Sequence, residues 1–215
     1  MDPMGMTRWV LPTVVLTHFP CALCVPALKG LVSAQMKWNP FKKKQDEEPD
    51  FDPLSDLSLD TLKVGYILDY DLTSWKVTAH NRYDYEGDWT DEWELSSADE
   101  VRYLEREEDD DVSWVLYRKI SLDAIEEDVP AHIIEHEDPP ETVTCEGVQY
   151  EAESSDAGHF HRNGAEEGKP FVNWTYECEN EKQVLLIEQW GESDFEASFG
   201  EVVEPYQFSN ILPGV

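Results

Sequence analysis

From residue 64 onward, apolar and polar positions follow the two-residue period of β-strands. Residues 75–80 alternate apolar with polar side chains, which is typical of a strand that is buried on one face. Similar short runs, rich in aromatic and β-branched residues, occur at residues 64–70, 92–95, 101–105 and 114–117. We therefore predict a first β module over residues 58–120, either a bent antiparallel sheet or a small, partly open barrel.

The alternation stops at residue 121. Apolar residues with the spacing of one helix face follow, at Leu122, Ile125, Val129 and Ile133. Because Pro130 falls among them, we expect two short helical pieces, the second of which begins at this proline. A Pro-Pro pair at residues 139–140 ends the segment. Residues 121–140 are thus predicted to be a short helical connector.

The segment of residues 90–119 resembles the segment of residues 172–201. Two pairs of aromatic residues keep the same spacing of 81 positions: Trp93 with Trp174, and Trp114 with Phe195. The second half of the chain carries additional residues around 163–168, upstream of this segment, which we interpret as a longer hairpin loop. We therefore predict a mainly β fold of two tandem antiparallel β modules joined by the connector, with the second module over residues 141–215. Two small halves can bury an apolar face between them that neither could bury alone.

The first 57 residues differ from the rest. Residues 1–35 hold an apolar run that prolines interrupt, whereas a signal peptide needs an uninterrupted one. We favour a non-folding extension with Met36 as the true start, which places the protein in the cytoplasm; secretion through a signal-like segment is the alternative. Residues 36–57 are a basic and proline-rich linker. Its side chains that can touch a membrane surface are Trp38, Phe41, Lys42, Lys43 and Lys44.

Acidic residues dominate the composition. The 47 Asp and Glu against 16 Lys and Arg give a net charge of −31. Such a surface repels nucleic acids and anionic lipids, because binding to them depends on Lys and Arg. Aromatic residues make up 12% of the chain, which is enough to build an apolar core despite the charge. Because of the net negative charge, we exclude nucleic acid as a partner.

Six short motifs follow one another along the chain: Leu62-Lys63-Val64-Gly65, Asp69-Tyr70-Asp71, Trp75-Lys76-Val77, Glu92-Trp93-Glu94-Leu95, Tyr103-Leu104-Glu105 and Ile187-Glu188-Gln189-Trp190. In this order they resemble the bacterial family called domain of unknown function 4178, present as two tandem copies over about residues 62–213. Many members begin with a Phe-Lys-Lys stretch such as that at Phe41, which supports Met36 as the start. The resemblance implies no catalytic residue and no cofactor. By gene association, it points to a membrane-stress or polyamine-linked system.

Three groups of residues consist of side-chain types that bind metals. His132, Glu135 and His136 fit the H-x-x-E-H pattern, in which two histidines hold zinc and the glutamate acts as a base. The imidazoles of His159 and His161 would share one face of a strand. The acidic run at 105–111 lacks the glycine and the ligand spacing of a calcium loop. For the three groups in turn we favour surface histidines on a connector, an ordinary edge strand and a solvated hairpin tip.

Aromatic and acidic residues of the first module form the other candidate site. The indole rings of Trp75, Trp93 and Trp114, with the carboxylates of Glu92 and Glu94, can hold an organic cation such as a polyamine. Packing of the tryptophans in the core and a wet face for the glutamates are the alternative interpretation.

Together these patterns favour a non-enzymatic acidic binding or adaptor protein, whose partner is a protein or a small organic cation. The alternative is a metal-dependent hydrolase that uses His132, Glu135 and His136. We expect functional differences between the copies where they diverge, in the acidic tip at residues 107–111 and in the inserted loop at residues 163–168.

Overall fold

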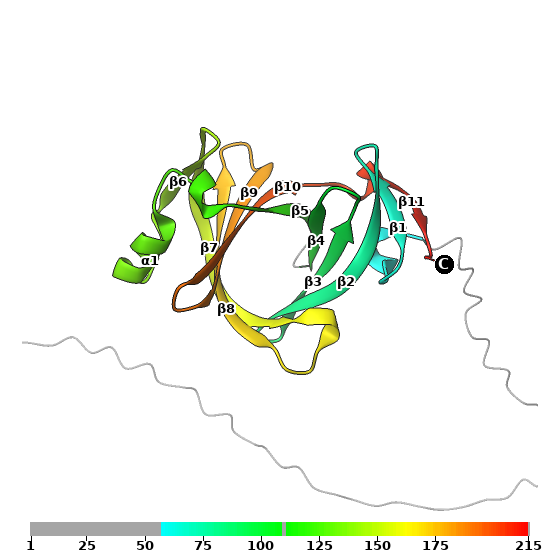
Figure 1. Ribbon diagram of the computed structural model, residues 1–215, viewed down its shortest axis with the longest axis horizontal. Coiled ribbons are helices and arrows are strands. Elements are labelled where there is room, and N and C mark those ends of the chain that lie inside the picture. The colour runs from blue at the N-terminus through cyan, green and yellow to red at the C-terminus, as the bar shows by residue number, and fades with distance from the viewer. Residues whose placement is uncertain (1–56, 109–110, 215) are drawn as a thin grey trace, which may run out of the picture. The chain divides into compact units, whose positions relative to one another are not determined.

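The structure is a computed structural model that describes residues 57–108 and 111–214 (Figure 1). The prediction of a mainly β fold is confirmed, because eleven strands occur in this part of the chain beside a single α-helix of 8 residues. The strands are β1 (Ile67–Tyr70), β2 (Thr73–Tyr85), β3 (Asp88–Ser96), β4 (Val101–Glu108), β5 (Val112–Ile120), β6 (Thr142–Cys145), β7 (Val148–His161), β8 (Lys169–Cys178), β9 (Gln183–Gly191), β10 (Asp194–Val202) and β11 (Phe208–Leu212). The helices are α1 (Val129–His136) and the 3-10 turns η1 (Leu59–Thr61), η2 (Leu122–Ala124), η3 (Arg162–Gly164) and η4 (Pro205–Gln207).

The strands form one antiparallel sheet that closes on itself. Strand β2 pairs with β3 along most of its length and also with β7, through Arg82–Asp84 against residues 159–161. Strands β5 and β10 pair at the other junction. The order β2-β3-β4-β5-β10-β9-β8-β7 is therefore a ring of eight strands, which Figure 1 shows, and β1, β11 and β6 extend it. The predicted division into two modules stays a prediction, since a single sheet spans both stretches of sequence.

A glycine makes the seam between β2 and β7 possible. A Cβ atom at Gly158 would lie 2.5 Å from the backbone oxygen of Asp84, far inside van der Waals contact. Any larger residue at this position would push the two strands apart.

Apolar side chains pack on the outer face of the ring in two clusters. The first holds Trp75, Trp93 and Trp114 together with residues of η1 and β11. The second combines residues of β6 to β10 with Val129 and Ile133 of α1. Because successive side chains of a strand point to opposite faces, the alternate residues of the same strands face the interior of the ring.

The predicted connector contains η2 and α1. Asp128 caps α1 by accepting a hydrogen bond from the Ala131 N–H, and Pro130 lies in the first turn. Glu137 ends the helix in the left-handed conformation. Among the described residues, no helix has the length and apolar character that crossing a membrane requires.

Candidate functional site

The interior of the ring brings two buried carboxylates to one phenol. Glu92 of β3 is 7% exposed and Glu188 of β9 is 1% exposed. These strands lie four places apart around the ring in either direction, so the two carboxylates come from opposite walls. The Tyr83 hydroxyl lies 3.1 Å from Glu92 Oε2 and 3.4 Å from Glu188 Oε1.

One phenolic hydrogen cannot be donated to two carboxylates at once. Burial, with a smaller contribution from the negative charge of Glu188, raises the pKa of Glu92 to about 7, although the hydrogen bond from Asn81 lowers it. A protonated Glu92 can donate to the Tyr83 oxygen, which leaves the phenolic hydrogen for Glu188. Tyr83 itself keeps its proton, because burial raises its pKa well above the usual range. The hydrogen bonding is therefore satisfied when Glu92 holds a proton.

Lys119 supplies the positive charge of this network. Its Nζ lies 2.7 Å from Glu188 Oε2 and 2.7 Å from Glu196 Oε2. Desolvation alone would lower the pKa of Lys119, but the charge and hydrogen bonds of the two glutamates raise it. Lys119 is therefore a permanent counter-ion for Glu188.

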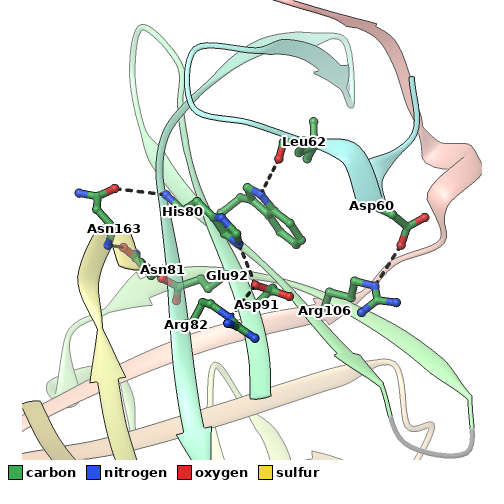
Figure 2. Close-up of polar contacts among 10 residues, drawn as sticks. Asp60, Leu62, His80, Asn81, Arg82, Asp91, Glu92, Arg106 and Asn163 are labelled. Atoms are coloured by element: carbon green, nitrogen blue, oxygen red, sulfur yellow. Dashed lines mark hydrogen bonds and ion pairs between the residues drawn. The ribbon is translucent and has the colours of Figure 1, made fainter. Parts of the chain in front are cut away.

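The inserted loop contacts the same network (Figure 2). Asn81 Nδ2 donates to Glu92 Oε1 at 2.8 Å, and the Asn163 N–H donates to Asn81 Oδ1 at 3.0 Å. Asn163 also accepts a hydrogen bond from the backbone of His80 at 3.4 Å. Its φ of 51° is left-handed, a conformation that asparagine tolerates better than most residues. The loop at residues 163–168 thereby fixes the position of Asn81, which orients the Glu92 carboxyl.

A cavity of about 640 Å³, which we call the acidic cavity, opens beside this network inside the ring. Its carboxylates are Asp88, Glu105, Glu107, Glu108, Glu153, Asp156 and Glu177. Its aromatic side chains are Tyr83, Tyr85, Trp89 and Tyr117. Of the described residues that line it, none is Lys, Arg or His. The cavity therefore has one sign of charge and several ring faces.

Glu105 is a half-buried carboxylate in the lining of the acidic cavity. Burial raises the pKa of Glu105 well above its usual range, and the charges of Glu92 and Glu107 add to this effect. The hydroxyl of Tyr117 has a raised pKa for the same reasons, burial first and Glu105 second. A positive ligand would reverse this effect and favour the ionised form of Glu105.

Asn173 presents an unused acceptor at the acidic cavity. The residue is 7% exposed, and its Nδ2 donates to the Tyr85 hydroxyl at 3.1 Å. Its Oδ1 is buried and has no hydrogen-bond partner among the described residues. Such an acceptor costs about 1–3 kcal/mol unless a donor reaches it. An N–H group of a ligand in the cavity would be that donor.

Comparisons with known proteins agree with the motif order. A family model described as domain of unknown function (DUF4178) matches residues 63–205. The chain belongs to this family. A protein of Aquifex aeolicus (strain VF5), described as uncharacterized, is 29% identical over 170 residues, which cover 79% of this chain and 93% of that protein. No solved structure matches the chain. The family resemblance is thus confirmed, whereas the tandem copies within it stay a prediction.

The structure separates the residues of the aromatic and acidic site predicted from the sequence. Trp75, Trp93 and Trp114 are 2%, 3% and 4% exposed in the outer core. Glu92 and Glu94 face the interior of the ring, on the opposite side of β3 from Trp93. The aromatic rings beside the interior carboxylates are therefore different ones, chiefly tyrosines.

The histidines with metal-ligand spacing lie apart from the cavities. His132 and His136 are one turn apart on α1, with ring centroids 4.4 Å apart. His132 Nδ1 is already engaged by the Asp138 backbone oxygen at 2.7 Å. Within residues 57–108 and 111–214, no three His, Cys, Asp or Glu side chains are placed to hold a metal ion. The basic and aromatic residues at 38–44 lie outside the described residues.

The sequence reasoning missed Tyr83, Glu188, Lys119 and Asn173. For Glu188 a signal existed, because it interrupts the apolar run Val184 to Ile187 in the middle of a strand. A charged residue in such a run is rarely buried without a partner. Its partners come from other strands and could only be found from the closed ring.

Proposed function

We propose that this protein is a non-enzymatic, cytoplasmic binding protein whose acidic cavity holds an organic polycation such as a polyamine. The observation that carries the proposal is the lining of this cavity, with seven carboxylates, four aromatic residues and no basic side chain among the described residues. Asn173 Oδ1 adds a buried acceptor without a donor. These are the groups that an alkylammonium ligand needs.

Two physical effects favour such a ligand. Carboxylates of one sign around a cavity raise the local concentration of cations. An ammonium group also gains about 0.5–2 kcal/mol over the face of a Tyr or Trp ring, with the larger gain where the site removes its water. Glu105 and Glu177 are half-buried, so salt screens their charges less than those of the five exposed carboxylates of the cavity.

The test is a calorimetric titration with spermidine at about 0.15 M salt, where the screening length falls to about 8 Å. We expect saturable binding of one ligand per chain. The double substitution Glu105→Gln and Glu177→Gln is expected to weaken it by about tenfold or more, since charged hydrogen bonds contribute about 1.5–3 kcal/mol. Asn173→Leu is expected to weaken it while leaving the net charge unchanged.

The matched control removes two exposed carboxylates away from the cavity, with Glu135→Gln and Glu141→Gln. This control leaves the affinity nearly unchanged if the cavity is the site. Equal losses in both double variants would mean that the net charge of −31 attracts spermidine without a site. If the calorimetric titration shows no saturable binding of spermidine, the proposal is wrong.

We also infer that the two halves are tandem copies. The β2–β3 ladder shifts register between Val77 and Ala79, and the β7–β8 ladder shifts between Ala152 and Ser154. Next to the paired Trp93 and Trp174, Glu92 faces Glu105 in one half and Asn173 faces Glu188 in the other. A comparison of the two halves across family members would test this inference, which requires greater similarity at these positions than at exposed ones.

A further inference from the structure

The other end of the ring holds a second cavity, of about 450 Å³, which we call the mixed-charge cavity. The opposite ends of the same strands line it: β9 gives Val184 and Leu186 to the acidic cavity and Trp190 to this one. Its charged lining residues have both signs, with Glu92, Glu94, Glu167 and Glu196 against Lys119, Arg162 and Lys169. Its chemistry therefore differs from that of the acidic cavity.

Glu94 and Lys169 lie on opposite sides of this cavity. Carboxylates also occur on the Lys169 side, where Glu167 is two residues before Lys169 and Glu196 is on β10 beside β9. Glu92 and Glu94 are on β3, and Trp190 is on β9, four strands away in either direction around the ring. The Lys169 ammonium lies over the Trp190 ring, 4.7 Å from its centroid. One wall is thus acidic, and the wall opposite carries a cation on an aromatic ring.

Several donors of the mixed-charge cavity have unused capacity. Trp190 Nε1 is buried and has no hydrogen-bond partner among the described residues. The Arg162 guanidinium forms no ion pair with any described residue, and Lys169 has only a long contact of 3.8 Å with Asp194. The buried Trp190 N–H requires an acceptor such as a carboxylate, and the exposed Arg162 and Lys169 are free to pair with the same group. The acidic wall would repel a carboxylate unless the ligand also carries a positive charge.

We propose that the mixed-charge cavity binds a small zwitterion, namely an amino acid with an apolar or aromatic side chain. The ligand carboxylate lies toward Trp190 Nε1, Arg162 and Lys169, and its ammonium lies toward Glu94. Phe160 and Tyr103 line the same cavity and pack against the ligand side chain. A volume of about 450 Å³ is within the usual range for small-molecule sites.

The test uses L-phenylalanine and two analogues that each lack one charge. Phenethylamine keeps the ammonium, and 3-phenylpropanoate keeps the carboxylate. We expect calorimetry to show saturable binding of phenylalanine, and binding of each analogue weaker by about tenfold or more. Equal affinity for phenethylamine would make the cavity a cation site, and equal affinity for phenylpropanoate would make it an anion site; either result overturns the proposal.

Substitutions on the two walls are expected to have opposite effects on the affinities for the two analogues. Glu94→Gln should weaken phenylalanine binding by about tenfold and strengthen that of phenylpropanoate. Arg162→Met should weaken phenylalanine binding and strengthen that of phenethylamine. Trp190→Phe keeps a ring but removes the N–H, so it should weaken both ligands that carry a carboxylate. Lys182→Met, exposed and outside the cavity, is the control that should change nothing.

Spermidine titrations of the same variants separate this proposal from the first one. The three wall residues do not line the acidic cavity, so spermidine binding should persist in each variant and also shows that the variant is folded. No binding of phenylalanine at millimolar concentration would overturn the zwitterion site, whatever spermidine does. If the unsubstituted protein binds phenylalanine but not spermidine, the polyamine site is overturned and the zwitterion site stands.

Discussion

The substitution Glu92→Gln is expected to make the stability of the protein less dependent on pH. In the fold the pKa of Glu92 is about 7, against an ordinary value of 4.5. Between these values the folded state holds a proton that the unfolded chain has lost. The free energy of unfolding therefore falls as the pH rises through this window and levels off above it.

The size of the effect follows from the same two values. Each unit of pKa corresponds to about 1.4 kcal/mol, so ionisation of Glu92 costs the fold about 3 kcal/mol by pH 8. Glutamine is neutral at every pH and keeps both contacts, since Oε1 can accept from Asn81 and Nε2 can donate to the Tyr83 oxygen. We expect the variant to differ from the wild type by less than about 1 kcal/mol at pH 5 and to be about 3 kcal/mol more stable at pH 8.

Urea denaturation at pH values from 5 to 9 measures this difference directly. The control is Glu94→Gln, which removes the same charge from the same strand at a half-buried position where the carboxylate accepts from Thr78. Part of the gain in stability at high pH comes from Glu105. Burial and the charge of Glu92 raise the pKa of Glu105, so removal of that charge makes ionisation of Glu105 less costly and also stabilises the variant. Two results would refute burial of Glu92 as the cause of the pH dependence. One is a difference in the free energy of unfolding between variant and wild type that is the same at pH 5 and pH 8; the other is an equal gain in stability for Glu94→Gln.

Three further predictions concern the ring and the alternative function. Lys119→Met should destabilise the fold by about 3 kcal/mol at pH 8, because it leaves the buried Glu188 unpaired; adding Glu188→Gln should recover most of the loss in urea denaturation. Gly158→Ala should lower the free energy of unfolding by about 1–3 kcal/mol, because the added Cβ overlaps the Asp84 backbone oxygen where β2 meets β7. Gly191→Ala should lower it less, because a Cβ there would lie 3.7 Å from its nearest neighbour, the Asp194 Cβ. Elemental analysis of the purified protein should find no stoichiometric transition metal, and a metal that His132→Ala removes would support the hydrolase alternative.

The strands of the fold could be predicted because each is encoded locally. The alternation at residues 75–80 falls within β2, and the aromatic run at residues 114–117 lies within β5. Closure of the ring could not be predicted, because it depends on three residue pairs between β2 and β7 that lie 75 to 79 positions apart in the chain. Nothing in either strand by itself identifies the other as its neighbour.

The candidate site was predicted only in part for a related reason. Glu92 and Glu94 were found because they flank a tryptophan on a strand, and alternation alone places them on one face. Which face is buried depends on the outer core, where Trp93 packs against Trp114 at 5.7 Å between ring centroids. The partners Tyr83 and Glu188 come from strands that meet only in the closed ring, so no local pattern could connect them with Glu92.

The position of the apolar cores explains how the ring can tolerate a charged interior. A small closed β-barrel usually fills its interior with apolar side chains, but here the two main clusters pack on the outer face, against η1 and β11 in one half and against α1 in the other. Burial of these clusters stabilises the strands, so the interior is free to hold carboxylates that are costly to ionise. Neutral substitutions of the interior carboxylates should therefore leave the fold intact while they change ligand binding, whereas truncation of a core residue such as Trp75 should lower the free energy of unfolding by about 3–5 kcal/mol. This separation of stability from binding is what a protein needs if its buried charges serve ligands rather than the fold.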